Sequence, residues 1–157
     1  MAANVQLFRG PMSNVDKAKI ATQFISFLPH AKALDLRIED IGDGFAVISM
    51  PYNKNLVGDA STGVIHGGAV SALMDTCGGA AVMSHPDAPG GTATIDLRID
   101  YMRAAMPGQR ITARADCHHI TRTVAFVRAV ATDDDVARPV AMATGAFTVE
   151  RPKAAKT

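Results

Sequence analysis

The sequence predicts an α+β fold in which an antiparallel sheet packs against one central buried helix. Three observations lead to this prediction. Residues 62–85 have a helical pattern and are apolar on nearly all sides, which is typical of a helix inside a core. Two short segments with strand-like patterns precede this helix, and four follow it. Strands on both sides of a single helix favour α+β, with the apolar face of the sheet on that helix.

The part of the chain before the central helix is expected to contain a first helix, a hairpin and a long loop. The helix has a capping residue at Ser13 or Asn14, and the strands show apolar alternation. In order, the expected elements are a helix over Val15–Leu28 ended by Pro29, a strand over Leu34–Glu39, a turn at Gly42–Gly44, a strand over Phe45–Met50 and a polar loop over Pro51–Gly63.

The part after the central helix is expected to consist of strands. Alternation places Ile95 on the apolar face of the first strand and Thr94 on its polar face. The run Asp133-Asp134-Asp135 is interpreted as the solvated tip of a hairpin. The four expected strands are Thr92–Arg103, Ile111–Ile120, Thr123–Thr132 and Val140–Val149.

Composition limits the class of protein without deciding its function. At 157 residues the chain is expected to form one domain, residues 1–157, with frayed tails at 1–12 and 152–157. The 16 basic and 15 acidic residues give a net charge of +1, which does not indicate a nucleic-acid partner. No stretch approaches the roughly 18 apolar residues of a membrane span. Two cysteines, Cys77 and Cys117, favour a reduced, cytoplasmic protein.

The central helix carries one residue that does not fit a core, the acid Asp75. The helix is expected to open at His66-Gly67-Gly68 and to continue to about Ser84. Burying a carboxylate is costly unless it is paired, hydrogen-bonded or used in chemistry. A hydroxyl such as that of Ser71 or Thr76 would be a purely structural partner, so spacing alone leaves both a structural and a catalytic role open.

The first turn of this helix is glycine-rich, with Gly67 followed by Gly68. Each glycine costs about 1 kcal/mol relative to alanine inside a helix, but at the first turn it exposes N–H groups that have no intrahelical partner. These groups and the helix dipole attract an oxyanion or a carbonyl oxygen. A polarising helix N-terminus combined with a carboxylate indicates a hydrolytic site. Close packing of the helix on a strand also explains the glycines and is compatible with that role.

The spacing of these groups indicates a site built from two chains. Gly67 and Asp75 are eight residues apart, which is roughly 12 Å along a helix axis. Reaction at one carbonyl needs both groups within about 3 Å of it. A second, antiparallel copy related by a two-fold axis would place its own acid opposite the first glycine. The sequence therefore predicts a homo-oligomer, a dimer or a tetramer, with a composite site.

The motif G-V-I-H-G-G at residues 63–68, with Asp75 nine residues after the histidine, resembles that of the hotdog-fold acyl-CoA thioesterases of the phenylacetate-pathway (PaaI-like) type. The similarity continues through residues 92–108 and 119–130, so that it covers most of the chain from about 34 to 150. The resemblance implies a long antiparallel sheet wrapped around one central helix. The histidine and two glycines alone would be a weak signal, whereas their combination with the acid is fairly specific.

The resemblance also implies roles for individual residues. The amide of Gly67 would bind the thioester oxygen, and Asp75 of the partner subunit would act as nucleophile or general base. Thr94 would position the acid or the attacking water, reaching the site near a subunit boundary. His66 would cap the helix, support the oxyanion loop or take a direct part in the chemistry. The residues implied in substrate binding are Gly68, Tyr101, Arg103, Arg122 and Thr123; the two arginines would pair with phosphates, or are solvated surface residues.

One position departs from the family pattern. Some relatives have asparagine six residues before the histidine, where this chain has Ala60. Asn55 and Asp59 lie nearby in a longer loop, and the sequence leaves open whether either one replaces it.

Two other reactive residue types have structural explanations. Cys77 lies on the apolar helix, so core filling is favoured over a nucleophilic role. The pair His118-His119 is expected on alternating faces of a strand without further ligands, so no metal site is predicted.

We therefore predict an acyl-CoA thioesterase that produces free acid and coenzyme A without a metal or redox cofactor. Two alternatives stay open: a non-catalytic acyl-CoA-binding module, and a hotdog hydratase or dehydratase that acts on acyl thioesters. Asp75 argues against the binding module, which has no use for a costly acid. The sequence leaves open the acyl group, the choice between nucleophile and general base, and the choice between dimer and tetramer.

Overall fold

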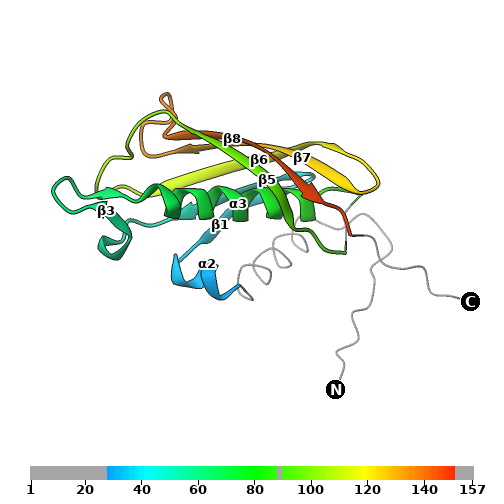
Figure 1. The fold of residues 1–157 in the computed structure, drawn as a ribbon, viewed down its shortest axis with the longest axis horizontal. Helices are drawn as coiled ribbons and strands as arrows, with labels where there is room; N and C mark the ends of the chain where they lie inside the picture. The colour runs from blue at the N-terminus through cyan, green and yellow to red at the C-terminus, as the bar shows by residue number, and fades with distance from the viewer. Residues whose placement is uncertain (1–27, 88–89, 151–157) are drawn as a thin grey trace, which may run out of the picture.

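The computed structural model describes residues 28–87 and 90–150, which form one curved sheet over one long helix (Figure 1). The elements in chain order are α2 (Pro29–Ala33), β1 (Arg37–Gly42), β2 (Phe45–Met50), the short 3-10 helix η1 (Lys54–Leu56), β3 (Val57–Asp59), β4 (Val64–Ile65), α3 (Gly67–Met83), β5 (Thr94–Tyr101), β6 (Ile111–Ile120), β7 (Val124–Thr132) and β8 (Ala141–Thr148). The helix expected over Val15–Leu28, apart from Leu28 itself, and the two expected tails lie outside the described residues.

The main sheet is antiparallel throughout, in the order β1-β2-β6-β7-β8-β5. Helix α3 packs along one face of this sheet, chiefly on β2, β6 and β7. Strand β5 forms one edge, because β8 is its partner on one side and no described strand pairs with its other side. The predicted α+β arrangement, an antiparallel sheet around a central helix, is confirmed.

Small residues let α3 lie close to the sheet. A Cβ atom added to Gly78 would lie 2.7 Å from the ring of Phe147 on β8, nearer than such atoms approach in real structures. Cys77 is fully buried beside it, and its thiol donates to the carbonyl oxygens of Ala46 and Ala113, each at 3.3 Å. Burial raises the pKa of the Cys77 thiol to about 12, which disfavours the reactive thiolate. Cys77 is therefore a core residue.

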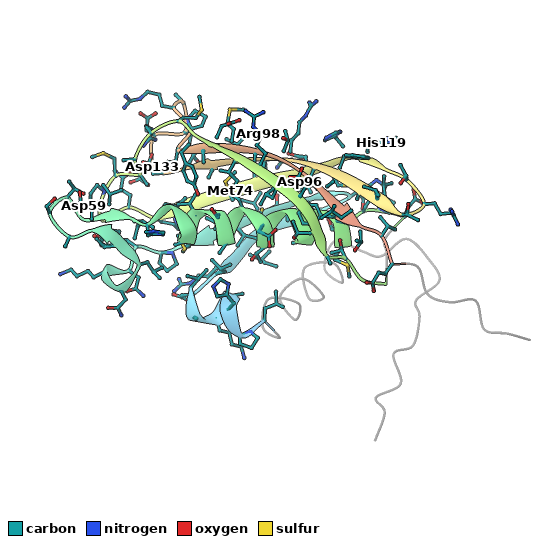
Figure 2. The ribbon with its side chains drawn as sticks, in the orientation of Figure 1. Asp59, Met74, Asp96, Arg98, His119 and Asp133 are labelled. Carbon is teal, nitrogen blue, oxygen red and sulfur yellow. The ribbon has the colours of Figure 1, made fainter. Side chains whose placement is uncertain are left out.

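Helix α3 is not buried on all sides as its composition predicted. The side that faces the sheet is buried, and Leu73 and Met74 on it are fully buried. Figure 2 labels Met74 on α3 and, for orientation, Asp96 on the neighbouring strand β5. A stripe of small and polar residues on the opposite side is half-buried or exposed. Its members are Gly67, Gly68, Ser71, Ala72, Asp75 and Thr76. Alanine and glycine count as apolar residues, but they are small enough to lie on a partly exposed side of a helix. The apolar composition of α3 therefore did not predict that this side is open.

Three boundaries before α3 differ from the sequence-based expectations. Pro29 opens α2 at its first helical position, where proline's missing N–H costs no helical hydrogen bond. Strand β1 begins at Arg37, because the alternating residues before it belong to the end of α2 and the following turn. The expected polar loop contains η1 and β3, and β3 pairs with β4 directly after the loop in a small hairpin that has Asp59 near its tip (Figure 2).

Candidate active site

The first turn of α3 leaves one backbone amide available. His66 is the N-cap residue, and its Nδ1 atom accepts a hydrogen bond of 2.9 Å from the N–H of Gly68. The N–H of Ala69 donates to the His66 carbonyl oxygen at 3.0 Å. No group among the described residues accepts a hydrogen bond from the N–H of Gly67. Of the first three amides of this helix, the Gly67 amide is the one left for a ligand oxygen.

The cap contact also defines what His66 can do. Because Nδ1 accepts a hydrogen bond, the proton of the neutral ring is on Nε2. Nδ1 is then unable to act as a base without breaking the cap. His66 therefore positions the first turn of α3, and its free edge offers a hydrogen-bond donor rather than a base.

Tyr101, at the end of β5, covers Gly67. Its hydroxyl donates a 2.6 Å hydrogen bond to the Gly67 carbonyl oxygen and lies 2.7 Å from the Ser71 hydroxyl. A Cβ atom at position 67 would be 3.3 Å from the Tyr101 ring, which is a tight contact. Glycine at this position thus allows Tyr101 to pack over the helix start. Tyr101, which was expected to bind substrate, thus contacts and positions Gly67, the residue with the free amide.

Asp75 lies two turns further along α3 and contacts Thr94 of β5. The Thr94 hydroxyl donates to Oδ1 of Asp75 at 2.7 Å. Within this single chain the carboxylate is half-buried rather than buried as expected, because it lies on the open stripe of α3. The hydroxyls suggested as structural partners bond elsewhere: Ser71 to Tyr101 and Gly67, and Thr76 to the carbonyl oxygen of Ala72.

A β-bulge explains how Thr94 reaches the helix. Simple alternation places Thr94 on the polar face of β5, but the pairing with β8 shifts between Thr94 and Asp96. Thr94 is paired with Phe147, whose side chain faces α3, and the extra residue Ile95 is 56% exposed. One inserted residue reverses the alternation beyond it. The bulge therefore moves Thr94 to the helix face.

We expect Thr94→Val to lower kcat about tenfold with little change in KM, because a charge-assisted hydrogen bond of roughly 1.5–3 kcal/mol to the acid is lost. Steady-state thioester hydrolysis measures this effect. Thr94→Ser keeps the hydroxyl and should retain most of the activity. An equal loss in both variants would indicate that the methyl group, not the hydroxyl, matters.

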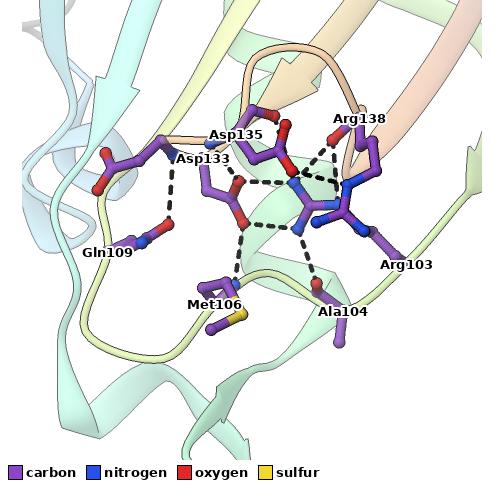
Figure 3. Close-up of polar contacts among 8 residues, drawn as sticks. Arg103, Ala104, Met106, Gln109, Asp133, Asp135 and Arg138 are labelled. Atoms are coloured by element: carbon purple, nitrogen blue, oxygen red, sulfur yellow. Dashed lines mark hydrogen bonds and ion pairs between the residues drawn. The ribbon is translucent and has the colours of Figure 1, made fainter.

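Arg103 is committed to contacts within the chain (Figure 3). Its guanidinium forms two 2.6 Å hydrogen bonds to the carboxylate of Asp133, and its other N–H groups donate to backbone oxygens that include those of Ala104 and Arg138. No N–H group of this side chain is left for a phosphate. The structure thus argues against the expected role of Arg103 in substrate binding.

Asp133 is likewise not part of a solvated hairpin tip. Its side chain is fully buried and also accepts hydrogen bonds from the N–H groups of Met106 and Asp135 (Figure 3). The hydrogen bonds from Arg103 hold the pKa of the Asp133 carboxyl well below its usual 3.8. This cluster joins the β7–β8 connection to the segment after β5 and so supports the wall beside Gly67.

We expect Asp133→Asn to lower the melting temperature by roughly 5–10 °C, because the half-buried Arg103 loses its charged partner. The lowered pKa means that the carboxylate stabilises the fold at neutral pH and that this stability is lost as the pH falls below about 4. The melting temperature of the variant should therefore depend less on pH in that range. Asp134→Asn, an exposed neighbour, is the matched control and should behave like wild type.

Two further expected substrate-binding residues lie at the other end of the sheet from Tyr101. Arg122 and Thr123 are exposed in the β6–β7 turn, and Val149 after β8 bonds to the Thr123 carbonyl oxygen. This end carries Thr94, whereas the opposite end of β5 carries Tyr101. The two ends of that eight-residue strand are about 20 Å apart. One chain therefore does not bring its two expected substrate-binding segments together.

The two residues near the position of the missing family asparagine differ in their surroundings. Asp59 is occupied by its own turn, where its carboxylate accepts hydrogen bonds from Ser61 and Thr62. These hydrogen bonds lower its pKa. Asn55 instead lines a cavity together with His66 and Gly68, and no described residue bonds its side-chain amide. Of the two residues, Asn55 is the one beside the helix start.

Two cavities flank the first turn of α3. One has a volume of about 270 Å³ and is lined by Gly67, Val70 and residues 101–105. The other, of about 410 Å³, lies between α2, residues 55–58 and α3, and Gly68 and Ala72 contribute to its wall. Among the residues in the described ranges no helix is long and apolar enough to cross a membrane, and no three His, Cys, Asp or Glu side chains cluster as a metal site.

An antiparallel sheet over one helix, with a free amide at the helix start and an acid on the same helix, defines the hotdog class of thioester-processing proteins. The sequence profile of the Thioesterase superfamily matches residues 62–140. The chain is 34% identical over 126 residues to the Halobacterium salinarum protein VNG_1336C, which bears an esterase name; the match covers 75% of this chain and 82% of that protein. The chain therefore belongs to the thioesterase superfamily, and it is a thioester hydrolase.

Other relatives agree with this membership. The medium/long-chain acyl-CoA thioesterase YigI of Salmonella typhimurium is 26% identical over 129 residues, covering 74% of this chain and 83% of YigI. A Pseudomonas aeruginosa crystal structure matches with a TM-score of 0.76 and 35% identity, covering 84% of this chain and 98% of that one. A mutant form of the phenylacetic acid degradation protein PaaI of Thermus thermophilus gives 0.69 and 27%, covering 78% and 99%. The predicted PaaI-like resemblance is confirmed.

Proposed function

We propose that the protein hydrolyses acyl-coenzyme A esters at sites that each use two chains. The Gly67 N–H of one chain polarises the thioester carbonyl, and Asp75 of the partner subunit either activates a water molecule or attacks the carbonyl carbon itself. In the first route water adds to the carbon while Asp75 takes its proton, and the C–S bond then breaks. The thiolate leaves and is protonated, so that the products are a free acid and coenzyme A.

The observation that carries this proposal is the separation of the two functional groups within one chain. Helix α3 runs without interruption from Gly67 to Met83, so Gly67 and Asp75 are about 12 Å apart along its axis. Tyr101 fixes the glycine end, and Thr94 fixes the acid. A second chain in antiparallel orientation would bring the acid of one copy to the glycine of the other.

The edge strand β5 supports this two-fold arrangement. Its outer side has no strand partner among the described residues, and unpaired edges readily pair with another chain. Exposed apolar side chains lie along and just after this strand: Ile95 at 56%, Tyr101 at 49% and Met102 at 60% exposure. Two β5 strands paired across a two-fold axis would cover these groups and would place the two α3 helices side by side.

The choice of coenzyme A esters as substrates rests on the relatives and on the cavity beside Gly67. Salmonella typhimurium YigI is named as an acyl-CoA thioesterase. The 270 Å³ cavity opens between Gly67 and residues 101–105, the segment that resembles the coenzyme A-binding segment of the family, and we assign it to the pantetheine arm. Arg122 and Thr123, brought from the partner's sheet end, remain candidates for the phosphates.

The two alternatives are less well supported. A pure binding module would not need an acid held by a hydroxyl two turns from a free amide. A hydratase or dehydratase on this fold would need a second catalytic group, and the His66 ring is committed to capping through Nδ1. A thiol-release assay over a panel of acyl-CoA esters separates hydrolysis from both alternatives, since only hydrolysis frees the thiol.

Subunit mixing tests the shared site directly. We expect an equimolar mixture of the Gly67→Pro and Asp75→Asn variants, each inactive alone, to regain about a quarter of the wild-type sites after exchange. Random exchange makes half of the dimers mixed, and each mixed dimer has one site with both lesions and one with neither.

Two controls make this result decisive. Exchange is verified with differently tagged chains, and mixing each variant with itself should restore nothing. If exchange occurs and activity does not return, each site is built from a single chain and the proposed arrangement is wrong, even if thioester hydrolysis itself is intact.

A further inference from the structure

The 410 Å³ cavity on the outer side of the first α3 turn is not used by the steps described above. Its apolar wall comes from three parts of the chain: Leu34 after α2, Leu56 and Val57 where η1 meets β3, and Ala72 on α3. A cavity of several hundred cubic ångströms with apolar walls and a few polar groups is typical of a small-molecule site. This cavity therefore has the size and the wall chemistry to hold part of a substrate.

The position of this cavity relative to the free Gly67 amide limits which part of the substrate it can hold. His66 and Gly68, on either side of Gly67, contribute to this cavity, whereas Gly67 itself lines the 270 Å³ cavity. A thioester carbonyl bound at the Gly67 N–H thus lies between two cavities. An acyl-coenzyme A has two arms at its thioester, and the proposed function already assigns the smaller cavity to the pantetheine arm.

We propose that the 410 Å³ cavity holds the acyl group and selects an uncharged, apolar one. This inference rests on the proposed function and names its substrate class. In the described part of the chain no Lys, Arg, Asp or Glu lines the cavity; its titratable side chains are His30, on α2, and His66, whose Nδ1 is held by the Gly68 N–H. A carboxylate at the end of the acyl group would lose its water without gaining the permanent positive charge of a lysine or arginine, which is costly. An alkyl or aryl group, in contrast, gains from contact with Leu34, Leu56 and Val57.

Two residues set the limits of this selection. Ala72 lies on the half-buried stripe of α3, where a larger side chain would project into the cavity and shorten it. Asn55 is exposed at the rim, and no described residue bonds its side-chain amide. It offers the cavity a neutral polar group in a place where a lysine would supply the missing positive charge.

The test measures kcat/KM for linear acyl-CoA esters of increasing length and for the matched esters that end in a carboxylate. In the wild type we expect a rise of up to about fourfold for each added methylene until the cavity is full. We expect at least a hundredfold preference for the uncharged ester of each matched pair. Asn55→Lys should reduce that preference at least tenfold.

Size variants test the cavity itself. Ala72→Leu should lower kcat/KM at least tenfold for the longest accepted esters and leave acetyl-CoA little changed, and Leu56→Ala should extend the accepted length. Ala33→Leu makes the same substitution at an exposed neighbouring position outside the cavity and should leave the length profile unchanged. Melting temperatures of all variants are compared, and Leu56→Ala provides the answer if Ala72→Leu does not fold.

The outcomes distinguish the inference from the function on which it rests. If esters are hydrolysed but both size variants leave the length profile unchanged, or if carboxylate-ended esters are hydrolysed as well as their neutral partners, the cavity assignment is wrong and the hydrolase remains. If no ester releases its thiol, the proposed function fails and the inference fails with it.

Discussion

Asp75→Asn is expected to lower kcat for acyl-CoA hydrolysis by about 10²–10⁴-fold while leaving the fold intact. The amide has the same size as the carboxylate and still accepts a hydrogen bond from Thr94, but it neither takes a proton from water nor attacks a carbonyl carbon. KM should change little, because the acid acts on the reacting atoms rather than on the substrate arms. Steady-state kinetics and a thermal melt of the same preparation measure both parts of this expectation.

A matched control separates the acid from the helix that carries it. Thr76→Val changes the next residue of α3, whose hydroxyl bonds only to the helix backbone. This variant should keep near wild-type turnover. Turnover within a few fold of wild type in Asp75→Asn would refute the proposed mechanism, because no other acid is proposed for the step.

Gly67→Pro is expected to lower kcat by about 10²–10³-fold, the usual effect of removing one oxyanion donor. Proline removes the N–H of position 67 without breaking a helical hydrogen bond, because this is the first helical residue. The preceding residue, His66, already has φ −60° and ψ 134°, which is the conformation that a following proline favours. The substitution therefore deletes the proposed donor at a position whose backbone accepts it.

Gly67→Ala is the control for the steric part of that substitution. It adds a Cβ atom in the same place, 3.3 Å from the Tyr101 ring, and keeps the N–H group. We expect a small loss of stability and a smaller loss of kcat than with proline. Equal losses of kcat in the two variants would mean that contact with Tyr101, rather than loss of the amide N–H, explains the effect. The assignment of the Gly67 amide as the oxyanion donor would then be wrong.

Much of the architecture could be predicted because it depends on neighbouring residues. Strand β6 begins and ends where alternation placed it, and α3 begins at the glycines and ends one residue before Ser84. The tight turn between Gly42 and Phe45 also follows from local turn chemistry. These elements are encoded by spacing and by residue type within a few positions, which a single sequence displays.

The site could be predicted only in part. The position of Gly67 and Asp75 on one helix follows from the sequence, whereas their joint use in a site of two chains stays a prediction. The tight cover of Gly67 by Tyr101 and the hydrogen bond from Thr94 to Asp75 do not follow from the sequence, because each joins residues at least 19 positions apart. Their roles in catalysis stay predictions for the variants described above.

The sequence by itself determined the order of the six main-sheet strands and of the central helix, though not the small β3–β4 hairpin, and it placed Gly67 and Asp75 eight residues apart on that helix. The tertiary structure decided which side chains face each other. An inserted residue at Ile95 turned Thr94 toward the acid, because a bulge reverses the two-residue period of a strand. Burial of Asp133 drew Arg103 into an ion pair across 30 positions, because a buried carboxylate needs a charged partner wherever the fold supplies one.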